Sequence, residues 1–246
     1  MITEEENKLL AQTNKGTLCG ELMRRYWQPA VLSEELTPDK PLPVTILGEE
    51  LILFREGDGK PALIGRWCAH QGVDMVYGRV EADGLRCMYH GWMFDRCGKV
   101  VIRGEWLPEK ERRWDVGQPA HPCVEEHGII FTWMGSEDAP PLDLANLVAD
   151  EWPETCSKIA HEENYLRPIS SIAVQNAGAK FLMPNLIVLP GGKTAAELHW
   201  FVPTDDNSHA QFTVPVSQMP QITALPLAAA PGVLVEAVRK VELEGP

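Results

Sequence analysis

Short apolar runs separated by turn residues dominate the chain from about position 30 to position 138. Four of these runs have the length of β-strands: 44–47, 51–54, 62–64 and 128–134. A Glu-Gly-Asp-Gly sequence at 56–59 separates two of them and is typical of a tight turn. We therefore expect one all-antiparallel β domain over residues 30–138.

The residues before this domain follow a helical period instead. Thr3 and Glu6 have the spacing of a capping box, which predicts a helix that runs to about residue 12. Apolar residues spaced by four between positions 18 and 26 predict a second amphipathic helix. Residues 1–29 are therefore expected to form a helical arm.

The pattern changes again after a proline-rich sequence at 138–142, which is typical of a stiff linker. Three longer strands are expected beyond it: 181–190, 197–203 and 210–216. The chain is thus expected to be an α+β protein in which residues 139–246 form a separate domain.

The charge of the chain excludes one broad class of function. Its 246 residues contain 22 Lys and Arg against 35 Asp and Glu, a formal net charge of −13, whereas nucleic-acid binding needs a basic surface.

The acidic amino terminus shows no signal peptide. The apolar stretch at 222–238 contains Pro226 and Pro231 and is too short to span a bilayer comfortably. We expect a cytoplasmic protein that binds neither nucleic acid nor membrane.

Two short sequences carry the candidate chemistry. Cys68-Ala-His70 and Cys87-Met-Tyr-His90 each offer one thiolate and one imidazole, and sixteen residues separate them. Two turns brought face to face would supply two sulfur and two nitrogen ligands. That is the ligand set of a Rieske [2Fe-2S] cluster, in which two His replace two Cys on one iron.

Glycines and cysteines elsewhere bear on this interpretation. Gly72 and Gly91 follow the two motifs and would let the backbone pass close to a cluster. A structural zinc site is the alternative, but zinc modules pair like ligands, whereas each motif here is mixed. The remaining cysteines show no pairing pattern, which fits a reducing compartment: Cys19, Cys97, Cys123 and Cys156.

The two motifs resemble the Rieske domain of ring-hydroxylating oxygenase α subunits. The resemblance covers Cys68-Ala-His70-Gln-Gly72 and Cys87-Met-Tyr-His90-Gly-Trp92, and the sequences at 1–10 and 22–29 resemble the phthalate dioxygenase-like branch. Neither motif has the extra Cys of respiratory Rieske proteins, which implies an oxygenase type of cluster. Gln71 stands where family members commonly have Arg.

The resemblance implies a function, cofactors and partners. Cys68 and Cys87 would bind one iron of the cluster, and His70 and His90 the other. The chain would be a terminal oxygenase that takes electrons from an NAD(P)H-dependent flavin/iron-sulfur reductase or a ferredoxin. A mononuclear Fe(II) in a helix-grip domain would activate O2 to hydroxylate or O-demethylate a small aromatic compound. The family usually forms head-to-tail homotrimers.

The ligands of this second iron are missing from the sequence. Asn164-Tyr-Leu166 resembles the opening of the family's iron helix, but residues 167–176 contain no His, Asp or Glu. The best substitute is His199 and His209 with Asp205 or Asp206, which a hairpin could bring together. No catalytic residue is therefore assigned.

The other histidines are expected to have no metal role. We expect His161 to lie with Glu162 and Glu163 on a solvated face. We expect His121 and His127 to lie on the surface of the Rieske domain.

Two hypotheses explain the missing ligands. In one, the sequence is an abridged form of a longer chain and the domain at 139–246 is incomplete, which an intact mass near 27.4 kDa would contradict. In the other, the chain really lacks the second iron and is a Rieske electron-transfer protein.

Overall fold

The computed structural model describes residues 2–103, 116–145, 147, 152–153, 155–176, 178–191, 196–217 and 224–244. The chain divides into two compact units. The first unit comprises Met1–Pro29, Ile46–Glu49 and Met134–Pro246, and the second comprises Ala30–Thr45 and Glu50–Trp133. Each unit is built around its own β-sheets.

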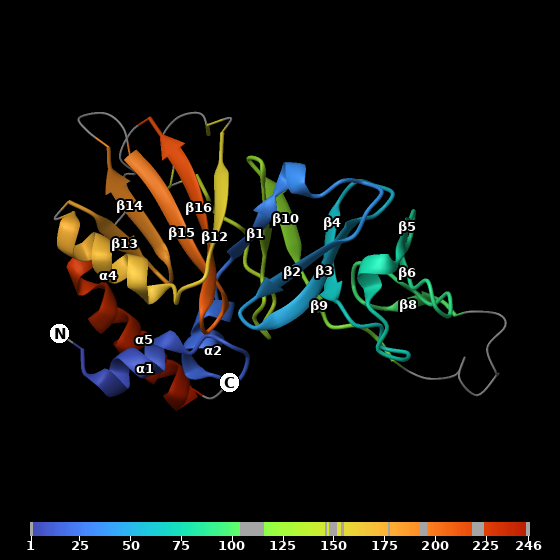
Figure 1. Cartoon of the computed structure of the whole chain (residues 1–246), viewed down its shortest axis with the longest axis horizontal. Helices are drawn as coiled ribbons and strands as arrows, with labels where there is room; N and C mark the ends of the chain where they lie inside the picture. Colours follow the sequence, from blue (N-terminus) through green and yellow to red (C-terminus); the bar gives the residue numbers. More distant parts are fainter. Residues whose placement is uncertain are drawn as a thin grey trace. The chain divides into compact units, whose positions relative to one another are not determined.

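The described strands of the second unit form three small sheets (Figure 1), with the orders β1-β11-β10, β2-β3-β4-β9 and β5-β6-β7-β8. The strands are β1 (Gln28–Leu32), β2 (Leu42–Ile46), β3 (Glu49–Arg55), β4 (Pro61–Gly65), β5 (Arg79–Glu81), β6 (Gly84–Arg86), β7 (Met93–Phe94), β8 (Val100–Ile102), β9 (Ala120–His121), β10 (Cys123–Glu126) and β11 (Ile129–Thr132). Two short 3-10 helices accompany them, η1 (Ser33–Glu35) and η2 (Met75–Tyr77). The pairs β3–β4, β4–β9, β5–β6, β6–β7, β7–β8 and β10–β11 are antiparallel.

Alternate residues of paired strands build the core of the second unit. Ile52 and Phe54 on β3 lie opposite Ile64 and Ala62 on β4. All four belong to one buried cluster, whose other members are Cys68, Met75, Leu85, Cys87, Trp92 and Phe94. The cysteines of both motifs are therefore part of this hydrophobic core.

Among the described residues, the first unit contains one six-stranded sheet and four helices (Figure 1). The sheet order is β12-β16-β15-β14-β13-β17, from β12 (Ser157–His161), β13 (Lys180–Leu182), β14 (Leu186–Pro190), β15 (Ala196–Asp205), β16 (Ser208–Val216) and β17 (Leu225–Pro226). The helices are α1 (Glu4–Ala11), α2 (Leu18–Arg24), α4 (Leu166–Gln175) and α5 (Ala230–Glu244), with the 3-10 helix η3 (Leu227–Ala229) before α5.

The amino-terminal helices form as the sequence predicts. Thr3 and Glu6 make the capping box of α1, and the Thr17 side chain accepts a hydrogen bond that caps α2. Both helices pack against α5, and the ion pair between Arg239 and Glu6 links α5 to α1 over 2.7 Å. Among the described residues, no helix has the length and apolar character needed to cross a bilayer.

The α+β class is confirmed, but one strand prediction is wrong. The run at 181–190 is not one strand, because it divides into β13 and β14 with a turn between them. Pro184 lies in that turn, and its missing N–H cannot contribute to a continuous ladder. From the sequence, the apolar stretch at 222–238 was considered only as a possible membrane segment. In the structure this stretch contains β17, η3 and part of α5.

Candidate metal centre

The first candidate ligand loop follows strand β4 and runs from Cys68 to Val73. The N–H of Cys68 donates to the carbonyl of Val73 over 2.8 Å, and the N–H of Gly72 donates to the carbonyl of Cys68 over 2.7 Å. Gly72 has a φ of 69°, a left-handed conformation that glycine adopts without a steric penalty. The loop is therefore a tight turn that carries His70 at its tip.

The second loop connects β6 to β7 and closes with the same hydrogen bonds. The N–H of Cys87 donates to the carbonyl of Trp92 over 2.7 Å, and the N–H of Gly91 donates to the carbonyl of Cys87 over 3.1 Å. Gly91 has a φ of 71°. Each loop thus begins with a Cys and has a left-handed Gly four positions later, with a His between them.

The two thiols lie together at the base of these loops. Cys68 and Cys87 are buried, and their sulfur atoms hydrogen-bond to each other. This contact lowers the pKa of Cys87 to about 6 and raises the pKa of Cys68, because one sulfur becomes the acceptor of the other's proton.

Main-chain N–H groups face each sulfur and favour its negative form. Those of His70 and Gln71 lower the pKa of Cys68, and those of Tyr89 and His90 lower the pKa of Cys87. The donors come from the second and third residues after each Cys. Hydrogen bonds from N–H groups to an ionised sulfur are the kind that stabilise a thiolate ligand.

The two imidazoles lie next to each other. His70 is buried and His90 is half-buried, and their ring centroids are 4.8 Å apart with the planes at 77°. The His70 ring also stacks on the indole of Trp92, with centroids 4.6 Å apart and planes within 9°. The two loops therefore present two nitrogen and two sulfur ligands side by side.

This arrangement fits a two-iron cluster better than a single ion. A structural zinc needs four ligands around one point. Among the described residues, no three His, Cys, Asp or Glu side chains converge in that way. A [2Fe-2S] cluster spreads its four protein ligands over two irons, with the thiolates and imidazoles segregated. The paired sulfurs and the neighbouring rings have that segregation.

Ion pairs that the sequence analysis did not identify hold the two loops. Arg66 makes a two-pronged contact with Asp74, with Nε–Oδ1 at 3.0 Å and Nη2–Oδ2 at 2.7 Å. Arg86 donates to the carbonyl of Gly91 over 2.9 Å and pairs with Glu81. Hydrogen bonds from Arg86 and from Arg79 lower the pKa of Glu81 to about 2. The partners of each pair are eight and five positions apart, a spacing with no helical or motif signature in the sequence.

The loops carry exposed apolar side chains at their edges. Trp67 and Tyr77 accompany the first loop, and Met88 and Tyr89 lie within the second; Tyr77 is 69% and Met88 66% exposed. Large apolar groups exposed in one region are typical of an interaction site.

The substitute set for a mononuclear iron does not assemble. His199 contacts Glu197 through Nε2 over 2.9 Å and Gln211 through Nδ1 over 2.9 Å. Asp206 accepts hydrogen bonds from the N–H groups of Thr13 and Asn14. Asp205, the alternative carboxylate, accepts from the N–H of Asn207 over 2.7 Å. In the part of the chain that the structure describes, no three His, Cys, Asp or Glu side chains form a metal site.

His209 forms a different pair from the one proposed. It lies directly opposite His161 in the pairing of β12 with β16, and the two rings stack with centroids 4.8 Å apart. Its Nδ1 donates to the carbonyl of Glu163 over 2.7 Å. Glu162 is exposed, as expected of a solvated face, whereas the ring of His161 is half-buried against the buried ring of His209.

Helix α4 contains the segment that follows Asn164. The side chain of Asn164 caps the start of the helix by accepting from the N–H of Leu166 over 3.0 Å, and it donates to the carbonyls of Ala11 and Asp206. The helix itself offers no metal-ligating side chain.

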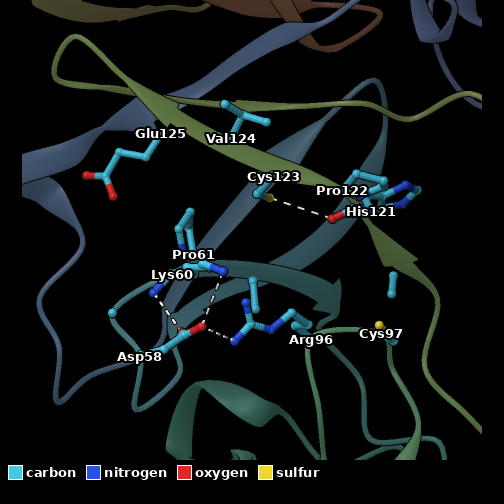
Figure 2. A pocket seen from close by; sticks show the side chains of 13 residues that line it. Asp58, Lys60, Pro61, Arg96, Cys97, His121, Pro122, Cys123, Val124 and Glu125 are labelled. Atoms are coloured by element: carbon cyan, nitrogen blue, oxygen red, sulfur yellow. Dashed lines mark hydrogen bonds and ion pairs between the residues drawn. The ribbon is translucent and has the colours of Figure 1, made fainter. Parts of the chain in front are cut away.

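A cavity of about 830 Å³ lies elsewhere in the second unit and contains none of the four candidate ligands. Figure 2 shows His121 and Cys123 on one side and the ion pair of Asp58 with Arg96 on another. Burial raises the pKa of Cys123 to about 12. His121 therefore lines a cavity, whereas His127 is exposed at a turn, as expected.

Comparison with known proteins assigns the loops to a family. Residues 26–107 match the Rieske [2Fe-2S] domain family, and this range includes both loops. The chain is 33% identical over 224 residues to the oxygenase subunit of tert-butanol monooxygenase/tert-amyl alcohol desaturase from Aquincola tertiaricarbonis, covering 84% of this chain and 47% of that protein. It is 38% identical over 143 residues to the phthalate 4,5-dioxygenase oxygenase subunit from Pseudomonas putida, covering 57% of this chain and 33% of the relative.

Solved structures share the fold. A structure of dicamba monooxygenase bound to dicamba aligns with a TM-score of 0.61 at 19% identity, over 92% of this chain and 91% of that one. The terminal oxygenase of carbazole 1,9a-dioxygenase from Novosphingobium sp. KA1 aligns with a TM-score of 0.62 at 16% identity, over 97% and 89%. By contrast, the chain spans only about half of the length of the tert-butanol monooxygenase subunit and about a third of the length of the phthalate 4,5-dioxygenase subunit.

Proposed function

We propose that this chain is the terminal oxygenase component of a Rieske non-haem iron system, like the oxygenase subunits to which it is similar. The observation that carries the proposal is the matched closure of two loops, which brings Cys68 and Cys87 together and His70 beside His90.

The four side chains are proposed to hold a [2Fe-2S] cluster, with the thiolates on one iron and the imidazoles on the other. A bound cluster of this kind supplies one-electron transfer. The protein contributes buried sulfurs, four main-chain N–H donors to them, and a histidine pair of which only His90 is partly open. Neutral imidazole ligands make the site less negative than four thiolates would, which raises its potential.

The domains are proposed to divide this work. Residues 1–29 form an arm, residues 30–138 the Rieske domain, and residues 139–246 a catalytic-type domain. The arm and the last domain share the first compact unit, and α1 and α2 pack on α5. The second compact unit, Ala30–Thr45 with Glu50–Trp133, supports the proposed Rieske domain.

The partners proposed are an NAD(P)H-dependent flavin/iron-sulfur reductase or a ferredoxin as the electron donor, and a small aromatic compound with O2 as the substrates. The oxygenase names of the relatives support this class of reaction. The exposed Tyr77, Met88 and Tyr89 support a protein contact at the loops, since apolar and aromatic groups dominate the centres of protein interfaces. The proposed homotrimer rests on the family resemblance, and the proposed cytoplasmic location rests on the cysteines, whose lack of a disulfide pairing pattern fits a reducing compartment.

A second candidate function follows from one specific observation. Among the described residues no mononuclear metal site is present, and α4 lacks ligands. An electron-transfer protein that holds only the cluster would have these properties.

Metal and sulfide analysis tests both functions. About three irons and two acid-labile sulfides per chain, with O2 uptake that depends on reductase and an aromatic compound, is the result expected of the oxygenase. Two irons, two sulfides and no O2 uptake would assign the carrier function instead. Colourless protein without sulfide would overturn both.

A further inference from the structure

Trp92 connects the two candidate ligand loops. Its carbonyl accepts the N–H of Cys87 and so closes the second loop. Its indole ring lies parallel to the imidazole of His70 in the first loop, with centroids 4.6 Å apart and planes within 9°. The side chain is fully buried in the core that also contains Cys68. A change at Trp92 therefore acts on both loops.

The indole N–H of Trp92 is buried and has no hydrogen-bond partner among the described residues. Leaving such a donor unpaired costs about 1–3 kcal/mol, so native cores rarely contain one. The other groups in ring contact with Trp92 are Phe94 at 6.4 Å and the guanidinium of Arg103 at 5.8 Å, and neither offers an acceptor. The indole N–H is thus a buried donor for which neither Phe94 nor Arg103 supplies an acceptor.

We propose that Trp92 positions His70 and tunes the [2Fe-2S] site: its ring fixes the plane of the imidazole, and its N–H donates to a sulfur of the bound cluster. This inference rests on the proposed function, because it requires the cluster. A donor to sulfur favours the state with more negative charge, which is the reduced state, and so raises the midpoint potential. The parallel contact restricts rotation of the imidazole and keeps one ring nitrogen directed to the metal.

The test compares Trp92→Phe with the parent protein as purified with its cluster. Phenylalanine keeps an aromatic face for His70 but removes the N–H together with the rest of the five-membered ring, so a control with the same loss of volume is needed. We expect the variant to retain the iron and sulfide content and the mixed-ligand electron paramagnetic resonance spectrum of the parent, with a lower midpoint potential. A full cluster with the parent's potential would overturn the donation.

Trp133→Phe is the matched control. Trp133 is also buried in the second unit but is not part of the core around the loops, so its replacement should leave the potential unchanged. An equal fall in both variants would show a general effect of tryptophan loss and would overturn the proposal.

A second measurement on the parent protein decides the case if Trp92→Phe fails to hold its cluster. Protein grown with indole-15N-tryptophan should show 15N hyperfine coupling in pulsed spectra of the reduced cluster, and its absence would overturn the inference. Failure of the parent itself to bind two irons and two sulfides would instead refute the proposed function.

Discussion

Arg66 and Asp74 clamp the first ligand loop with two parallel hydrogen bonds of 3.0 and 2.7 Å between guanidinium and carboxylate. The Asp74 carboxylate also accepts the N–H of Val76 over 3.0 Å and so caps the 3-10 helix η2. The pair thus joins the residues on either side of the loop that contains Cys68 and His70. Its geometry is of the bidentate kind that gives the stronger ion pairs.

We predict that Asp74→Asn lowers the free energy of unfolding of the second unit by about 1–2 kcal/mol, because it removes a charge-assisted pair that is mostly shielded from water. It should also speed iron loss to a chelator. Urea unfolding and the rate of bleaching measure the two effects. Asp58→Asn, which weakens a more exposed pair with Arg96, is the control. It should lower the free energy of unfolding less and speed iron loss less than Asp74→Asn does.

The same pair predicts a dependence on acid. Hydrogen bonds from Arg66, together with the N–H of Val76, hold the pKa of Asp74 below its usual range. A carboxyl whose pKa is lower in the folded protein stabilises it above the unfolded pKa of about 4, and this stability is lost as the pH falls through the folded value. The difference in unfolding free energy between parent and Asp74→Asn should therefore shrink below pH 4. A constant difference down to pH 2 would contradict the assignment.

Replacing two glycines by alanine, one in a ligand loop and one outside it, distinguishes a loss of stability from a loss of the metal cluster. Gly72 and Gly59 both have a left-handed φ, 69° and 80°, and an added Cβ would meet no atom within 4 Å at either position. Each Ala variant should therefore cost about 1–2 kcal/mol of stability from backbone conformation alone. Only Gly72→Ala should also reduce iron and sulfide content, because Gly72 closes the loop that carries His70. Equal cluster content in both variants would contradict the role of this loop.

The cysteines outside the loops should differ in reactivity. Cys97 is exposed, whereas burial raises the pKa of Cys19 to about 11 and that of Cys123 to about 12. Since the thiolate is the reactive form, iodoacetamide at pH 8 should label Cys97 first and leave Cys19 and Cys123 largely unmodified in the native protein. Peptide mass spectrometry measures the order, and Cys97→Ser should abolish the fast phase. Rapid labelling of Cys19 would show that its environment is open.

The stacked pair of His209 and His161 predicts that the first unit weakens in mild acid. Burial lowers the pKa of His209, and the neighbouring His161 lowers it further, while the hydrogen bond to the carbonyl of Glu163 acts in the opposite sense. A histidine with a lowered folded pKa contributes its full stability above the unfolded value of about 6.5 and loses it as the pH falls below that value. Stability should therefore fall between pH 7 and pH 5.

Hydrogen exchange of β16 measured across this pH range, with urea unfolding beside it, tests the prediction. His209→Gln should flatten the pH dependence by up to about 1.4 kcal/mol per pH unit, the limit for one proton. His127→Gln, at an exposed turn, should leave it unchanged. A parent protein equally stable at pH 7 and pH 5 would contradict the prediction.

The sequence by itself determined the features that depend on neighbours along the chain. The capping box of Thr3 and Glu6, the short strands before position 138 and the spacing of Cys and His within each motif are local, and a few residues suffice to specify a cap, a strand or a tight turn. The chemistry of the four ligands followed from their type alone.

Only the tertiary structure decided which distant groups meet. The pairing of β6 with β7 and the course of the first loop set the contact of Trp92 with His70, and the register of β12 on β16 set the stack of His161 on His209 rather than a metal site with His199. A shift of one residue in such a register moves every side chain to the other face of the sheet. Contacts of this kind depend on how strands far apart in sequence align, and no local pattern specifies that alignment.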